Sequence, residues 1–200
     1  SSSLLALVGC GERAGDSPRR LRLWNTTTSS AVFELTFATA VLNVLMNRTR
    51  LLVVLEDATH IFELLTMRML HTLDTMPNPR AVAALSVEGE ASYCAVLPPG
   101  INSTGSAEPS AATSSAGKVG TVLIFDGAQG RPLGSIAAHS SPVARVALSP
   151  SGDTLATCSE KGTVVRVHAC PSGELLHTLR RGSTRATIYS LSFGTTASAA

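Results

Sequence analysis

Aromatic side chains are scarce in this chain of 200 residues, which has one Trp, two Tyr and five Phe. Its hydrophobic content is nevertheless 44%, which is enough for a packed core and excludes an intrinsically disordered chain. An excess of one charge is also missing, because the formal net charge is only +2. Such a balance gives no support for nucleic-acid binding. Any important basic residue must therefore act through its local placement.

Cysteine patterns of metal sites and disulfide scaffolds are absent as well. The four cysteines, Cys10, Cys94, Cys158 and Cys170, form no Cys-x-x-Cys pair and have no His at finger-like spacing, so we expect no structural zinc and no other metal. Their dispersed positions fit a reducing compartment better than a disulfide framework. No apolar run approaches the ~18–20 residues that span a bilayer.

Signals of catalysis are missing too. The five histidines have no carboxylate or nucleophile at motif spacing, and no Gly-x-Ser-x-Gly occurs, so we expect no enzyme activity and no cofactor. One stretch, Gly9-Cys10-Gly11-Glu12-Arg13-Ala14, resembles a dinucleotide fingerprint. That motif needs a helix to begin at the glycines, and here Asp16-Ser17-Pro18 and an alternating strand pattern follow. We interpret the stretch as a hairpin turn.

What the chain does contain is a succession of short apolar runs separated by polar turns. Such runs, rich in β-branched or large apolar residues, are typical of strands, and nowhere is a helical period sustained over a dozen residues. The chain is therefore predicted to be all β. The predicted strands lie at residues 4–8, 21–24, 31–37, 41–46, 51–56, 60–64, 69–73, 82–87, 93–97, 122–126, 133–137, 143–148, 154–158, 164–168 and 175–179.

An internal repeat indicates how these strands are organised. Similar strand ends recur in two series, Trp24, Phe62, Phe125 and Val167 in one and Met46, Leu85, Leu148 and Phe193 in the other. The steps are 38, 63 and 42 residues in the first series and 39, 63 and 45 in the second. Without the long middle step, a period of about 40 residues with four short strands per unit is typical of a β-propeller blade.

Both series lengthen at the same place, residues 98–118. This stretch is almost wholly Gly, Ser, Ala, Thr, Pro and Asn, with Ile101 the only large apolar residue after the prolines. Such a composition predicts a low-complexity flexible loop inserted between two strands of one blade.

Two adjacent arginines follow the last predicted strand, in Leu179-Arg180-Arg181-Gly182. Neighbouring side chains of an extended segment point to opposite faces, so Arg180 and Arg181 could serve two pockets on either side of one strand. Each guanidinium offers a planar fork of donors suited to phosphate oxygens. The pair indicates two phosphate sites, and a solvated basic strand end is the alternative.

Several segments together resemble the PROPPIN family, the phosphoinositide-binding WD-repeat propellers of autophagy. The resemblance runs nearly end to end and is interrupted mainly at residues 98–118. It is carried by residues 17–25, 46–51, 70–75, 138–143, 155–166, 179–182 and 188–193. The family signature is Phe-Arg-Arg-Gly, and Leu179 replaces its Phe here. We expect Leu179 to pack inward.

The resemblance implies a WD40-like β-propeller, seven-bladed in the family. We expect residues 1–200 to be a fragment of it, with the end of blade two, blades three to five and the first strand of blade six. It also implies two lipid headgroup sites on the rim. The first maps onto His139, Thr157, Ser159, Gly162, Thr163, Arg166 and Arg180, and the second begins with Arg181 and Gly182.

The function implied is that of a membrane-recruited scaffold in autophagy. Its ligands would be phosphatidylinositol 3-phosphate and the 3,5-bisphosphate, and its partners autophagy proteins, with no nucleic acid. It would be cytoplasmic and peripheral on phagophore (preautophagosomal), endosomal or vacuolar membranes. Arg48 and Arg50 are candidates for binding a partner's acidic surface, with a solvated rim as the alternative. The competing function is a WD-repeat scaffold that binds proteins and no lipid.

Overall fold

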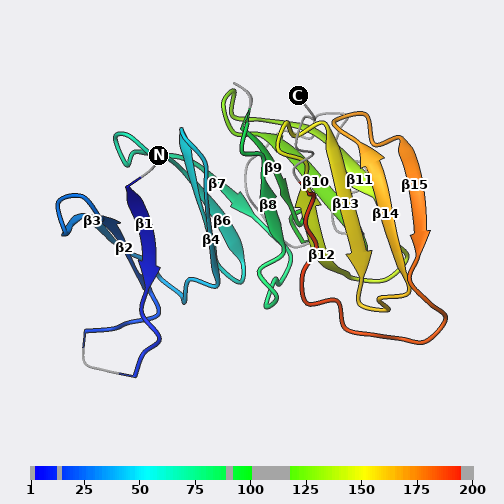
Figure 1. Ribbon diagram of the computed structural model, residues 1–200, viewed down its shortest axis with the longest axis horizontal. Coiled ribbons are helices and arrows are strands. Elements are labelled where there is room, and N and C mark those ends of the chain that lie inside the picture. Colours follow the sequence, from blue (N-terminus) through cyan, green and yellow to red (C-terminus); the bar gives the residue numbers. More distant parts are fainter. Residues whose placement is uncertain (1–2, 13–14, 89–91, 101–117, 195–200) are drawn as a thin grey trace.

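The computed structural model of the chain describes residues 3–12, 15–88, 92–100 and 118–194. Every regular element in these ranges is a β-strand, and none of the described residues form a helix long and apolar enough to cross a membrane. Figure 1 shows the strands grouped into sheets that stand side by side along the molecule. There are one three-stranded sheet and three four-stranded sheets, all antiparallel and each formed from consecutive strands.

We number the sheets as blades two to five, following the order in the predicted propeller. Blade two comprises β1 (Leu4–Val8), β2 (Arg20–Asn25) and β3 (Ser30–Thr36). Blade three comprises β4 (Asn43–Met46), β5 (Arg50–Val54), β6 (Ala58–Glu63) and β7 (Met69–Asp74). Blade four comprises β8 (Ala83–Leu85), β9 (Tyr93–Val96), β10 (Thr121–Asp126) and β11 (Arg131–Ala137). Blade five comprises β12 (Val143–Leu148), β13 (Thr154–Ser159), β14 (Val164–Ala169) and β15 (Leu175–Arg180).

The first strands of the complete blades gather on one side of the array. β8 contacts both β4 and β12, while later strands of each blade lie progressively farther out (Figure 1). Strands that radiate from a shared inner edge, blade after blade, define a partial β-propeller. The structure thus confirms the predicted fold class. The repeat is also explained, because Phe62, Phe125 and Val167 lie on the third strands β6, β10 and β14.

Each border between neighbouring blades is closed by an apolar core. β5 shows how one strand serves two borders: Leu51 packs toward blade two, and Leu52 packs toward blade four, as alternation of side chains requires. A strand that is covered on both faces is usually apolar along its whole length. β10 is such a strand, because all six of its residues are buried. Burial of this apolar surface, at about 25 cal/mol per Å², holds the blades together.

The glycine-rich stretch between β1 and β2 contains no helix in its described part. The amide of Gly11 donates to the carbonyl of Asp16 at 2.7 Å, and Gly11 adopts a φ of 84° that favours glycine. β1 and β2 then pair in antiparallel register. The stretch is therefore a hairpin connection, as predicted, and not a nucleotide-binding motif.

Two expectations about the end of the chain were wrong in detail. The segment at residues 188–193, predicted to be the first strand of blade six, forms no strand. An inner strand pairs with the second strand of its own blade, and the described residues include no second strand of blade six. Leu179, expected to pack inward, is 58% exposed. It pairs with Val165 and so lies on the face of β15 opposite to Arg180, and all six residues of β15 are exposed.

The predicted loop at residues 98–118 falls mostly outside the described residues and stays a prediction. The two strands on either side of it, β9 and β10, are neighbours in one sheet, and Val96 pairs with Leu123.

A candidate anion-binding site on blade five

The candidate site is built around the hairpin turn between β13 and β14. The amide of Gly162 donates to the carbonyl of Ser159 at 2.9 Å, which closes the turn. Gly162 has a φ of 62°, and a Cβ there would lie 1.8 Å from the carbonyl oxygen of Ala186. Only glycine fits this backbone and this contact. The amide of Gly162 is therefore committed to the turn and is not a free donor.

The sheet register places four of the predicted residues on one face of blade five. Thr157 pairs with Arg166 across β13 and β14, and cross-strand partners share a face. Ser159 lies two residues beyond Thr157 and so lies on the same face. Arg180 pairs with Val164, which is likewise two residues from Arg166. This face looks toward blade four, because the guanidinium Nη1 of Arg166 donates to the carbonyl of Ala138.

His139 joins this face from the connection between blades four and five. Its ring Nε2 lies 3.0 Å from the hydroxyl of Thr157, and its amide donates to the carbonyl of Gly120 at 3.0 Å. Burial, and then the positive charge of Arg166, lower the pKa of His139 to about 4. The ring is therefore neutral at pH 7. The hydroxyl of Thr157 also donates to the backbone carbonyl of Arg166 at 3.4 Å, so His139, Thr157 and Arg166 form one hydrogen-bonded group.

The two adjacent arginines have different surroundings. Arg180 is exposed, and its side chain forms no hydrogen bond or ion pair with the residues that the structure describes. Arg181 instead donates from Nε to the carbonyl of Gly162 at 2.7 Å and from Nη2 to the carbonyl of Thr184 at 2.6 Å. Among the described residues, the hydroxyls of Ser159 and Thr163 likewise have no hydrogen-bond partner. The turn thus combines unused hydroxyl donors with a free guanidinium on the neighbouring strand.

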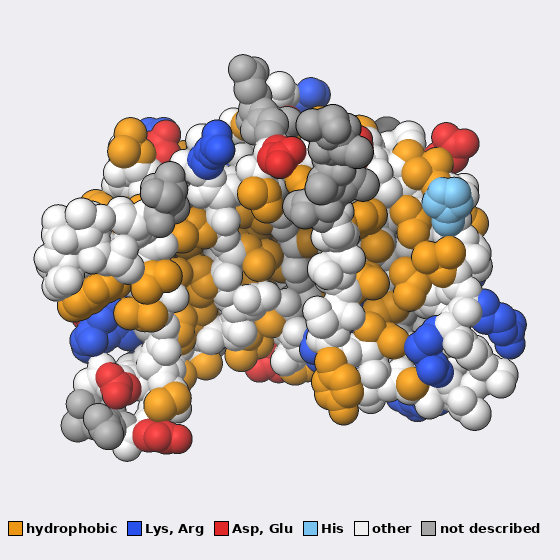
Figure 2. Space-filling model, in the orientation of Figure 1, with side chains coloured by type: hydrophobic (Ala, Val, Ile, Leu, Met, Phe, Trp, Pro, Cys, Tyr) orange, Lys and Arg blue, Asp and Glu red, His pale blue; other side chains and the backbone are white. Residues whose placement is uncertain are grey.

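Gly182 is tied to the same turn through its backbone. Its amide and that of Arg181 both point at the carbonyl of Thr163, at 3.4 and 2.9 Å. Figure 2 shows Lys and Arg side chains gathered at the lower right, over the region where β15 ends. This end of blade five can attract an anion with charge and bind its oxygens with hydroxyl and guanidinium donors. No group of three or more metal-ligating side chains occurs in the described ranges.

The two arginines predicted on blade three have separate roles in the structure. Arg50 donates from Nε to the carbonyl of Gly127 on blade four at 2.8 Å and from Nη1 to that of Thr49 at 3.1 Å. Its guanidinium therefore fastens two blades together. Arg48 is exposed and forms no hydrogen bond within the described part of the chain. Arg48 is the one of the two that is free to meet a partner.

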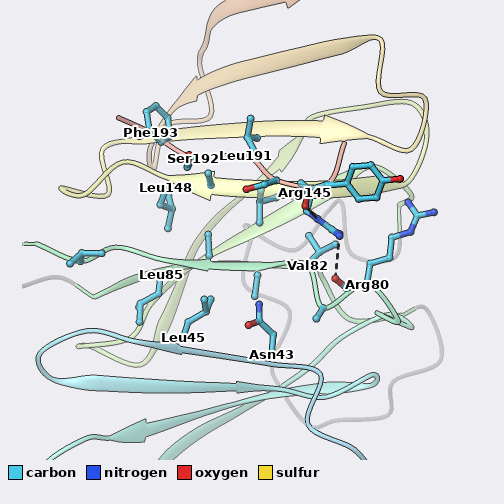
Figure 3. A pocket seen from close by; sticks show the side chains of 18 of the residues that line it. Asn43, Leu45, Arg80, Val82, Leu85, Arg145, Leu148, Leu191, Ser192 and Phe193 are labelled. Atoms are coloured by element: carbon cyan, nitrogen blue, oxygen red, sulfur yellow. Dashed lines mark hydrogen bonds between the residues drawn. The ribbon is translucent and has the colours of Figure 1, made fainter. Parts of the chain in front are cut away.

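A cavity with a volume of about 590 Å³ lies elsewhere, along the inner strands. It is lined mainly by apolar residues of β4, β8 and β12 and contains none of the predicted site residues. Figure 1 shows the segment after β15 returning beneath blade five and rising beside β12. Figure 3 shows Arg145 reaching into this space, where it donates to the carbonyls of Tyr189 and Arg80 at 3.0 and 3.4 Å.

This role of Arg145 could not be predicted from the sequence. Its only signal is a basic residue within the apolar run of an inner strand, and that signal does not say which distant carbonyls the side chain meets. Arg80 also forms an ion pair with Glu160 at 3.0 Å, so it links the connection before blade four to the turn of blade five.

Comparison with known proteins places the chain in a family. The fold defines it as a β-propeller, and a family model described as PROPPIN matches residues 1–199. It is 43% identical over 194 residues to Autophagy-related protein 18b of Arabidopsis thaliana, covering 97% of this chain and 48% of the relative. Autophagy-related protein 18 of Mycosarcoma maydis is 42% identical over 198 residues, covering 96% and 44%. The chain therefore belongs to the PROPPIN family.

Solved structures agree with this assignment. The complex of KlAtg21 with the coiled coil of AgAtg16 superposes with a TM-score of 0.76 at 26% identity, covering 97% of this chain and 58% of the other. Kluyveromyces lactis Hsv2 gives a TM-score of 0.70 at 18% identity, covering 96% and 52%, and shows the fold alone. The chain spans about half the length of the curated relatives it matches.

Proposed function

We propose that this chain carries the phosphoinositide-binding face of a propeller scaffold that is recruited to membranes in autophagy. The single observation that carries the proposal is the set of uncommitted donors at the end of blade five. Arg180 and the hydroxyls of Ser159 and Thr163 belong to the strand ends and the turn there, next to the strand positions of Thr157 and Arg166. Family membership supports the choice of ligand, and the named relatives are autophagy proteins.

The ligand would be phosphatidylinositol 3-phosphate or the 3,5-bisphosphate. A phosphomonoester carries nearly two negative charges and needs several donors, which the first site offers from one strand, turn and strand. Arg181 and Gly182 would begin the second site on the other side of β15. One rim arginine contributes only about 1 kcal/mol toward an anionic bilayer. Two sites on one rigid rim gain from effective concentration, which suits recruitment to a membrane.

Such a scaffold would be cytoplasmic and peripheral on phagophore, endosomal or vacuolar membranes. Its partners would be autophagy proteins, and the solved KlAtg21 complex contains the coiled coil of AgAtg16. Arg48, which is exposed on the rim of blade three, is the residue we assign to an acidic partner surface. Arg50 is a weaker assignment for the same surface, because its guanidinium already donates to Gly127.

The second candidate function is a scaffold that binds proteins and no lipid. One observation favours it: the guanidinium groups of Arg166 and Arg181 already donate to backbone carbonyls. In that case, Arg180 would be a solvated residue at the end of a strand.

Vesicle flotation of the full-length protein separates the two functions. Wild-type protein should float with phosphatidylcholine vesicles only when they contain phosphatidylinositol 3-phosphate. Arg180→Ala/Arg181→Ala should bind roughly 30-fold more weakly, since two rim charges of about 1 kcal/mol each are lost. Arg48→Ala, which removes one charge from another blade, is the control and should float normally. Equal flotation of wild type and double variant would reject the lipid site in favour of the protein scaffold.

A further inference from the structure

The turn that carries part of the first site is held by a side chain assigned to the second. The guanidinium of Arg181 donates through Nε to the carbonyl of Gly162 and through Nη2 to the carbonyl of Thr184, at 2.7 and 2.6 Å. The amide of Arg181 also donates to the carbonyl of Thr163 at 2.9 Å. One residue thus fastens the turn to β15 and to the segment that follows.

That following segment packs directly on the turn. The amide of Ala186 donates to the carbonyl of Lys161 at 3.2 Å, and the carbonyl oxygen of Ala186 lies where a side chain on Gly162 would have to lie. Residues 161–163 of the turn therefore contact residues 181–186. Its conformation depends on this contact as well as on β13 and β14.

We infer that Arg181 is a positioning residue for the first headgroup site, an inference that rests on the proposed function. Ser159 and Thr163 offer their hydroxyls from the two ends of this turn, so any movement of the turn changes how they meet a phosphate. A guanidinium has five N–H donors in a fixed fork. Nε holds the turn at Gly162 and Nη2 holds the following segment at Thr184, and Nη1 remains for an anion in the second site.

This arrangement predicts that removal of Arg181 lowers the headgroup affinity of both sites. If they were independent, removing Arg181 would abolish the second site and leave the affinity of the first unchanged. With Arg181 as a positioning residue, the same change also weakens the first site, because preorganisation of its donors is lost.

Hydrogen exchange of the full-length protein without lipid gives the first test. In Arg181→Ala, the amides of Gly182 and Ala186 should exchange about tenfold faster, because charge-assisted hydrogen bonds to the turn are gone. Arg181→Lys keeps the charge but lacks the fork, so exchange should remain fast. Arg185→Ala is the matched control: it removes an equal charge from the same segment, and Arg185 forms no hydrogen bond among the described residues.

Calorimetric titration with soluble dibutanoyl phosphatidylinositol 3-phosphate gives the second test. Wild type should bind two molecules. Arg181→Ala should bind one, about tenfold more weakly than Arg185→Ala binds its headgroups. A wild type that takes up no headgroup would overturn the proposed function and this inference with it. If the wild type binds but Arg181→Ala shows unchanged hydrogen exchange, the inference is wrong and the proposed function stands. The same holds if Arg181→Ala binds at its remaining site with unchanged affinity.

Discussion

The border between blades three and four and the border between blades four and five each place an arginine against a carbonyl of the neighbouring blade. Arg50 donates to Gly127 at the first border, and Arg166 donates to Ala138 at the second. At the first border the nearby polar groups satisfy one another, since Asn47 donates to both the carbonyl of Ser86 and the hydroxyl of Ser92. At the second, donors are left over.

The first border is an example of an arginine that only joins two blades, and the second has the unused donors that a binding site needs. An arginine on the rim of a propeller is weak evidence for a ligand, because its guanidinium can be fully used between blades. The informative feature is a set of donors that the protein itself does not use. Ser159, Thr163 and Arg180 form such a set at the end of blade five, whereas near Arg50 the hydroxyls of Thr49 and Ser92 bond each other at 3.1 Å.

The largest expected effect is on the free energy of unfolding and comes from the β13–β14 turn, beside the border between blades four and five. Gly162→Ala places a Cβ at a φ of 62° and 1.8 Å from the carbonyl oxygen of Ala186. We expect the free energy of unfolding to fall by about 3 kcal/mol, from left-handed strain and overpacking together. Urea denaturation measures this change as a lower midpoint.

The control for this substitution is Gly182, which contacts the same turn through its amide. Gly182→Ala meets no atom within 4 Å and requires no positive φ, so the unfolding free energy should change by less than about 0.5 kcal/mol. Equal midpoints for the two variants would show that the contact between the turn and Ala186 is not a constraint.

A reciprocal pair of substitutions tests the comparison of borders directly. Arg50→Ala removes a charged donor from the carbonyl of Gly127 and should lower the unfolding free energy by about 2 kcal/mol, with vesicle binding unchanged. Arg180→Ala should leave stability within about 0.5 kcal/mol of wild type and weaken vesicle binding about fivefold. Urea denaturation and flotation are measured on both. Loss of vesicle binding in Arg50→Ala at normal stability would show that Arg50 also takes part in lipid binding, which contradicts the comparison.

The smallest expected effect is a pH dependence of the unfolding free energy, which arises from His139 at the border between blades four and five. The pKa of His139 is lowered to about 4, mainly by burial and then by Arg166, while an unfolded histidine titrates near 6.5. Above pH 6.5 the ring is neutral in both states and its contribution is fully present. As the pH falls toward 4, only the unfolded chain takes up the proton, so stability is lost.

Because the ring is partly exposed, the loss should be only about 1 kcal/mol. Urea denaturation at pH 7 and pH 4.5 measures it, and His139→Gln should show a pH dependence smaller by that amount. The comparison with His139→Gln is needed because burial also lowers the pKa of His60 and of His168. An identical pH dependence in His139→Gln and wild type would show that protonation of His139 does not contribute to the loss of stability.

The strands could be predicted from the sequence because their signal is local. The run predicted at residues 122–126 corresponds to β10 (Thr121–Asp126), and the other predicted runs before residue 180 likewise coincide with strands. Alternation along an extended chain predicts opposite faces for Arg180 and Arg181, and in the structure only the Arg181 side chain donates to described residues; the two pockets stay a prediction. Local pattern says which way a side chain points and which stretches are extended.

Contacts between blades could not be predicted in this way. Arg50 meets a carbonyl 77 residues away, and Arg145 meets one 44 residues away; no period in the sequence encodes either distance. The segment at residues 188–193 carries the same apolar pattern as the strands. It is not one, since a strand needs a hydrogen-bonding partner as well as a pattern.

The pairing of β9 with β10 has a practical consequence for labelling the protein. Val96 faces Leu123 and Tyr93 faces Asp126, although the connection between the two strands runs from residue 97 to residue 120. The entropy of closing such a loop grows only slowly with its length, so the ladder tolerates extra residues there. A fluorescent domain with adjacent termini can be inserted upstream of Lys118, which leaves in place the carbonyl of Gly120 that holds His139. We therefore expect an insertion in this connection to leave the fold of blade five unchanged.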